Sequence, residues 1–73
     1  MREDHARELV ARSLRLSLES VPFDGSIETI PGWDSLSHFE VISAIENQTQ
    51  RRLTADEVVG LRSVKDVAVL LGP

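Results

Sequence analysis

The sequence predicts an all-α fold, a four-helix bundle in which the third helix is short and a long loop joins helices one and two. Apolar residues recur at three- and four-residue steps in two long segments, residues 3–18 and 34–50, which is the period of amphipathic helices. Prolines and glycines interrupt residues 19–34 between them. No internal repeat or linker-like stretch divides the 73 residues, so we expect one domain over residues 1–73.

Composition limits the size of any site. With 41% hydrophobic residues the chain forms one lean core, because a domain this small buries only about 60% of the surface of its unfolded chain. A large enclosed active site is therefore not expected. The absence of cysteine excludes disulfides, thiolate zinc sites and cysteine nucleophiles.

Charge and hydropathy limit the partners. The 12 acidic and eight basic residues give a net charge of −4, which opposes nucleic-acid binding because phosphate contacts need a surplus of Lys and Arg. No segment approaches the roughly 20 apolar residues of a membrane span, and the N-terminus leads into no apolar signal core. We expect a cytoplasmic monomer with basic protein partners. A chain that begins with Met and has no linker-like end is expected to be freestanding.

The first helix is predicted over residues 3–18. Glu3 and Asp4 in its first turn and Arg12 and Arg15 toward its end suit the helix dipole. Leu16 lies off the apolar stripe and is expected to be partly exposed. The residues expected on the stripe are Ala6, Leu9, Val10, Leu14 and Leu18.

Residues 19–34 are predicted to form the long loop, with a possible helical turn near residues 26–30. Loops of this length are uncommon in compact domains and usually have a function. We expect the loop to pack on the core through its apolar side chains, with Trp33 and Phe23 as anchors rather than stacking platforms. The packed residues are expected to be Val21, Phe23, Ile27, Ile30 and Trp33.

The second helix is predicted to begin after Asp34, whose carboxylate can accept hydrogen bonds from the first turn, and to run to about Gln50. From Asp34 to Gln50, both included, there are three acidic residues and no Lys or Arg, which predicts a surface of one sign. The expected apolar stripe is Leu36, Phe39, Ile42, Ile45 and Thr49, with Val41 and Ala44 beside it.

The last two helices are predicted from their first turns. Thr54 followed three residues later by Glu57 is a capping-box pattern, which indicates a short helix to about Gly60. Ser63 opens a final apolar helix that Gly72 and Pro73 end. The apolar residues of this final helix are Val64, Val67, Ala68, Leu70 and Leu71.

Ser35 is the most informative residue for function. It stands at the start of the acidic second helix, where the positive end of the helix dipole favours a phosphate group. A phosphodiester on Ser35 is one interpretation of this position. The other is an ordinary first-turn serine, which is common at helix starts.

The segment Asp34-Ser35-Leu36, followed by residues 39–42 and 44–46, resembles the Asp-Ser-Leu motif and second helix of acyl and peptidyl carrier proteins. The resemblance extends to the preceding loop, to residues 53–57 and to residues 63–67, and so covers nearly the whole chain. It implies a four-helix bundle of acyl carrier protein type. It also implies that Ser35 receives a covalent 4'-phosphopantetheine from coenzyme A, whose thiol then carries acyl or aminoacyl groups as thioesters.

The resemblance implies a set of partners and no catalytic activity in the chain itself. The partners are a phosphopantetheinyl transferase, an acyltransferase or adenylating loading enzyme, and ketosynthase or condensation enzymes. Charge complementarity would make these encounters fast and salt-sensitive. The residues implied to meet partners are Asp34, Leu36, Glu40, Val41 and Glu46. A solvated helix face for the two glutamates, and core packing for Leu36 and Val41, are the alternatives.

Late in the second helix this chain departs from many carriers. Where these have further acids and an aromatic residue, the sequence has Asn47, Gln48 and Thr49. Together with Trp33, the neutral end of this helix is more similar to freestanding carriers of polyketide or nonribosomal peptide pathways. An acyl carrier of natural-product biosynthesis is therefore expected, with an aminoacyl or peptidyl carrier as the alternative.

Two further functions stay open from the residues. An unmodified helical interaction domain would use the acidic helix to bind a basic protein surface. A small hydrolase would pair Ser35 with His38, three residues away on the same helix, although no orienting acid accompanies the pair. We expect His38 instead to border the arm or a partner, Arg51 and Arg52 to neutralise nearby acids, and no metal site.

Overall fold

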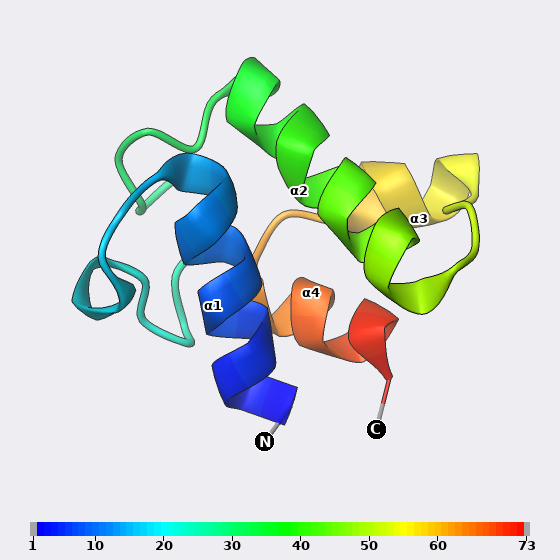
Figure 1. Cartoon of the computed structure of the whole chain (residues 1–73). Helices are drawn as coiled ribbons and strands as arrows, with labels where there is room; N and C mark the ends of the chain where they lie inside the picture. The colour runs from blue at the N-terminus through cyan, green and yellow to red at the C-terminus, as the bar shows by residue number, and fades with distance from the viewer. Residues whose placement is uncertain (1, 73) are drawn as a thin grey trace.

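The computed structural model describes residues 2–72 and is all-helical, so the predicted fold class is confirmed at that level. Within these residues no strand is formed. The helix α1 packs against both α2 and α4, and α2 also contacts α4, while α3 lies at the far side from the long loop (Figure 1). In chain order the elements are α1 (Arg2–Leu14), the 3-10 turn η1 (Leu18–Ser20), α2 (Ser35–Thr49), α3 (Ala55–Gly60) and α4 (Val64–Leu71).

The core is one apolar cluster to which α1, the loop, α2 and α4 all contribute. Every residue of the predicted α1 stripe except Leu18 is buried in it, and no polar or charged residue among those described is buried with them. Small and β-branched side chains dominate, as suits a lean core. Its members are Ala6, Leu9, Val10, Ala11, Leu14, Val21, Ile30, Trp33, Val41, Ile45, Leu61, Val64, Val67 and Ala68.

The first helix ends four residues earlier than predicted, at Leu14. Arg15 takes a left-handed conformation with φ of 61°, and the Leu16 N–H donates to the Ala11 carbonyl at 2.9 Å, which is a Schellman-type ending. Such endings usually carry glycine, so the sequence held no stop signal here. Leu18 consequently lies in η1 and is exposed, whereas Leu16 is partly buried as expected.

The loop packs on the core as predicted, through buried Val21, Ile30 and Trp33 and partly buried Phe23 and Ile27. The helical turn expected near residues 26–30 is formed as a single turn, in which the Ile30 N–H donates to the Ser26 carbonyl at 2.9 Å.

Polar contacts fix the loop at two places. The Arg7 side chain of α1 donates to the Val21 carbonyl at 2.7 Å and to the Leu18 carbonyl at 3.0 Å. The Ile27 N–H donates to the Arg62 carbonyl at 2.9 Å, and the Val64 N–H donates to the Gly25 carbonyl at 3.1 Å. The loop is therefore tied to α1 and to the start of α4.

The predicted boundaries of α2 are confirmed, but its predicted apolar stripe does not coincide with the buried side of the helix. The Asp34 carboxylate caps the helix, and Gln50 ends it in a left-handed conformation with φ of 60°. The fully buried residues are Val41 and Ile45, whereas Leu36 and Phe39 are exposed. Residues two apart on a helix lie about 200° apart, so Phe39 and Val41 cannot both face the core.

The starts of α3 and α4 follow the sequence signals. Thr54 and Glu57 form the complete capping box, and the Ser63 hydroxyl accepts the Asp66 N–H at 3.1 Å. Gly72 ends α4 with φ of 84°, a conformation that favours glycine, as predicted. Pro73 and Met1 lie outside the described residues.

Candidate functional site

Ser35 is the first residue of α2 and is exposed to solvent. The long loop delivers it there, because Trp33 is buried and Asp34 caps the helix. The Asp34 carboxylate accepts the Ser37 N–H at 3.0 Å, and the Asp34 carbonyl accepts the His38 N–H at 2.8 Å. The Ser35 hydroxyl thus stands at the positive end of a 15-residue helix.

The Asp34 carboxylate stays ionised at this helix start. The Ser37 backbone N–H, which donates to it, lowers the pKa of Asp34 below its usual value. A fixed negative charge therefore lies one residue from the Ser35 hydroxyl.

Two apolar side chains beside Ser35 are open to solvent. Leu36 is 72% exposed and Phe39 is 65% exposed. They are three residues apart and therefore neighbours on one side of the helix, and Glu40 follows one turn after Leu36. We call these four residues, Asp34, Leu36, Phe39 and Glu40, the exposed α2 face.

Sequence reasoning placed Phe39 on the apolar stripe and did not identify it as an exposed residue beside Ser35. Val41 and Ile45 are a β-branched pair at a four-residue step, and together with partly buried Ile42 they account for the core side of α2. A count of the helical angle would have put Phe39 opposite them. The available signal was that this helix has more apolar residues than one buried stripe can hold, so some of them must be exposed.

The sequence-predicted partner residues separate into two groups. Asp34, Leu36 and Glu40 are exposed. Val41 is 0% exposed and packs in the core, so the core alternative applies to it and its side chain is not on the surface. The Glu46 side chain is partly buried and accepts the Leu53 N–H at 2.9 Å, which ties α2 to the connection before α3.

His38 contacts Trp33 rather than Ser35. The Trp33 indole N–H donates to His38 Nδ1 at 3.0 Å. Partial burial, with the nearby positive charge of Arg62, lowers the pKa of His38 below its usual value. Among the described residues no hydrogen bond joins Ser35 to His38, so the geometry of a nucleophile and its base is not formed.

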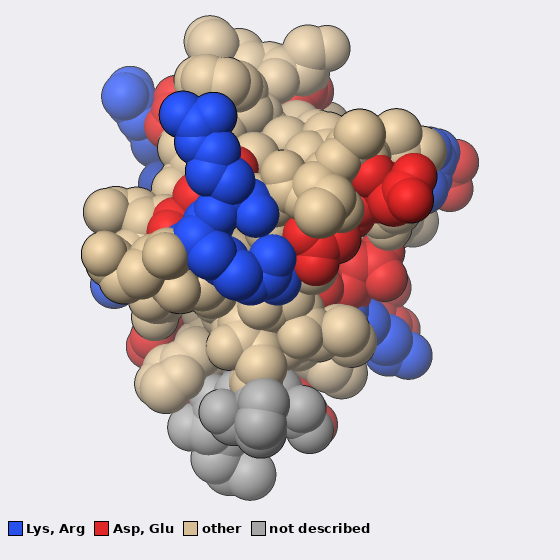
Figure 2. Space-filling model, turned by 90° about the vertical axis from the view of Figure 1, so that its right-hand side faces the viewer, with Lys and Arg blue, Asp and Glu red and all other residues tan. Residues whose placement is uncertain are grey.

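Charges of both signs surround the end of α2. The Arg51 guanidinium makes two hydrogen bonds of 3.1 Å to the Glu57 carboxylate, as the expected neutralising role requires. Arg51 and the Thr54 N–H lower the pKa of Glu57 to about 2. On the face that includes the α2–α3 connection, a cluster of Lys and Arg lies beside a cluster of Asp and Glu (Figure 2).

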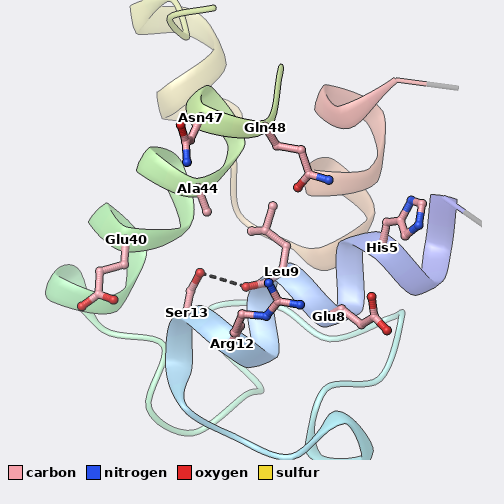
Figure 3. A pocket seen from close by; sticks show the side chains of 9 residues that line it. All are labelled: His5, Glu8, Leu9, Arg12, Ser13, Glu40, Ala44, Asn47 and Gln48. Atoms are coloured by element: carbon pink, nitrogen blue, oxygen red, sulfur yellow. Dashed lines mark hydrogen bonds between the residues drawn. The ribbon is translucent and has the colours of Figure 1, made fainter. Parts of the chain in front are cut away.

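An open groove of about 530 Å³ lies between α1 and α2 (Figure 3). Apart from Leu9 and Ala44 its lining is polar, and the Ser13 hydroxyl there donates to the Leu9 carbonyl at 2.8 Å. Neither Ser35 nor His38 lines this groove. It is lined by His5, Glu8, Leu9, Arg12, Ser13, Glu40, Ala44, Asn47 and Gln48.

Within residues 2–72 no group of three or more His, Asp and Glu side chains is arranged to hold a metal ion. No helix in this range is long and apolar enough to cross a bilayer. No protein-family model and no curated protein matches the chain.

Proposed function

We propose that the chain is a carrier protein, which holds acyl or aminoacyl intermediates as thioesters on a phosphopantetheine arm attached to Ser35. The observation that carries the proposal is an exposed serine at the first position of a long helix, beside exposed Leu36 and Phe39. The Asp-Ser-Leu resemblance supplies the chemistry. In this proposal the chain turns over no substrate itself.

Ser35 suits the anchoring of a phosphodiester for two reasons. Its hydroxyl is exposed, so a transferase can reach it, and it lies at the helix end where the dipole stabilises an anion. The arm would supply a thiol to a chain that has no cysteine. Tethering then raises the effective concentration of the intermediate at each docked partner.

The exposed α2 face is the surface we assign to partner enzymes. Leu36 and Phe39 gain from burial against another protein, and adjacent exposed apolar side chains are typical of interaction sites. Asp34 and Glu40 on the same face favour partners with Lys or Arg around an apolar depression. A transferase, a loading enzyme and a condensing enzyme are the partner classes that this role requires.

Intact mass tests the proposal directly. The protein is incubated with coenzyme A, magnesium and a broad-specificity phosphopantetheinyl transferase, beside the Ser35→Ala and Ser43→Ala variants. Ser43 is the matched control, because it is an exposed serine on the same helix. We expect one phosphopantetheine on the parent and on Ser43→Ala and none on Ser35→Ala.

The exposed α2 face also suits a second function, an unmodified helical interaction domain, because its apolar side chains need no arm to bind a partner. Failure of several transferases to modify a folded protein would favour this function. The cargo separates the carrier classes. Loading by adenylating enzymes would identify an aminoacyl or peptidyl carrier, and loading by acyltransferases an acyl carrier of natural-product biosynthesis.

A further inference from the structure

The hydrogen bond between Trp33 and His38 fixes the protonation state of the imidazole. An indole N–H only donates, so Nδ1 of His38 must be unprotonated to accept it at 3.0 Å, which makes the ring neutral with its proton on Nε2. Trp33 is only 6% exposed and its bond to His38 is partly buried, so loss of this acceptor costs free energy. The contact exists in one protonation state of His38 and not in the other.

The contact joins two residues that lie on either side of Ser35 in the sequence. Trp33 is in the loop and His38 is the fourth residue of α2, so the bond closes a ring of backbone that contains Asp34, Ser35 and Ser37. The two hydrogen bonds that start the helix, which the Ser37 and His38 N–H groups donate to Asp34, lie in the same ring.

Charged groups around His38 oppose a second positive charge. Arg62, from the connection between α3 and α4, raises the cost of the imidazolium, and partial burial adds to it. Glu28 of the loop lies 3.7 Å from the Arg62 guanidinium and partly balances it. The Asp34 carboxylate is engaged by the Ser37 N–H.

We propose that His38 is a proton-sensitive positioning residue: its neutral imidazole holds Trp33 and so orders the start of α2 around Ser35, and protonation at Nδ1 releases the indole and loosens that start. The contact between Trp33 and His38 does not depend on the function of the chain. Its consequence for loading of Ser35 rests on the proposed carrier function.

Fluorescence tests the contact first, because Trp33 is the only tryptophan and the chain has no tyrosine. Trp33 emission is followed between about pH 5 and pH 8, the range in which histidine titrates. We expect a transition with its midpoint below the ordinary histidine value of about 6.5. The His38→Asn variant keeps an acceptor at the same position but does not titrate, so its emission should stay flat.

The His5→Asn variant is the matched control, since His5 is exposed on α1 and should leave the transition unchanged. Circular dichroism at each pH reports whether the fold is kept. A transition that persists in His38→Asn, or a flat profile in the parent, would overturn the proposal.

Amide hydrogen exchange tests the loosening of the helix start. At each pH the Ser37 and His38 amides of the parent are compared with those of His38→Asn, so that the intrinsic pH dependence of exchange cancels. Loss of one hydrogen bond predicts about fivefold faster exchange in the parent below the transition and equal rates above it. Equal rates throughout would refute the positioning role.

Transferase kinetics then connect the contact to Ser35. The ratio of kcat/KM for parent and His38→Asn should fall about fivefold between the neutral and the acidic end, because dividing by the variant removes the transferase's own pH dependence. A constant ratio would show that the contact does not position Ser35. If no variant is loaded, the carrier function fails, whereas fluorescence and exchange still decide the contact.

Discussion

On one side of α2, Leu36 and Phe39 are 72% and 65% exposed, whereas on the other side Val41 and Ile45 are completely buried. The start and the buried side of the helix are also held by different contacts. The loop holds the start through the Asp34 cap and the Trp33–His38 contact, whereas the buried side packs in the core that α1 and α4 share. One helix thus supplies both a part of the core and a free apolar surface.

The strongest way to break this comparison is to truncate the buried side of α2. Ile45→Ala removes a fully buried side chain and should lower the free energy of unfolding by about 2 to 5 kcal/mol, since a cavity is added to the lost burial. Urea denaturation followed by circular dichroism measures the change. Ile45→Val, expected to cost about 0.5 to 1.5 kcal/mol, keeps the test readable where the alanine variant does not fold. If Ile45→Ala lowered the free energy of unfolding by less than Phe39→Ala does, the assignment of Ile45 to the buried side would be contradicted.

A methyl group in the loop tests how tightly the loop that leads into α2 is packed. A Cβ at Gly25 would lie 2.5 Å from Cδ1 of Ile30, which is itself buried. Gly25→Ala should therefore cost about 1 to 3 kcal/mol through overpacking. Gly60→Ala is the control, because nothing lies near a Cβ at that position. The Trp33 emission of Gly25→Ala should also shift. An unchanged free energy of unfolding would show that the loop accommodates the methyl group without cost.

Truncating the exposed side of α2 should change partner reactions rather than folding. Phe39→Ala is expected to leave the unfolding free energy within about 0.5 kcal/mol and to lower transferase kcat/KM about tenfold, the effect of an interface anchor. Val69→Ala is the control, because Val69 is 73% exposed on a different helix. Equal kinetic losses in both variants would remove the special role of the exposed α2 face.

The same substitution at two glutamates of α2 tests the comparison further. Glu46→Ala removes the acceptor of the Leu53 N–H and should cost about 1 kcal/mol of stability. Glu40→Ala should leave stability unchanged but make partner reactions less sensitive to salt, because Glu40 is exposed. Thermal unfolding and a salt series separate the two effects. If instead Glu40→Ala lowered stability and Glu46→Ala lowered the salt sensitivity, Glu46 and not Glu40 would lie at the partner surface.

The smallest expected effect lies in the connection after α2. Arg51 and the Thr54 N–H hold the pKa of Glu57 at about 2 instead of 4.5, so this group contributes stability above pH 4.5 that is lost as the pH falls toward 2. The two side chains are 46% and 29% exposed, which keeps the effect small and salt-dependent. Acid unfolding curves of the parent and Glu57→Gln should converge near pH 2 and separate slightly above pH 4.5. Curves that separate only at acid pH would reverse the sign.

Local signals in the sequence predicted most of the fold because each acts within a few residues. Asp34, Thr54 and Ser63 cap the helices that they were expected to begin, and the apolar residues of the loop pack as expected. The end of α1 was mispredicted because Arg15, a residue without glycine's conformational freedom, takes the left-handed position. The surrounding packing supports a backbone conformation that the residue alone does not favour.

The sequence by itself determined the helices, their caps and the place of Ser35 at a helix start, since capping and helical period depend on neighbours in the chain. Only the tertiary structure decided which side of α2 is buried. Leu36, Phe39, Val41 and Ile45 are all apolar, and the positions of α1 and α4 determine which of them lose contact with water. The same holds for Trp33 and His38, whose contact depends on how the loop returns to α2. Burial is a property of the assembled bundle, so no single segment specifies it.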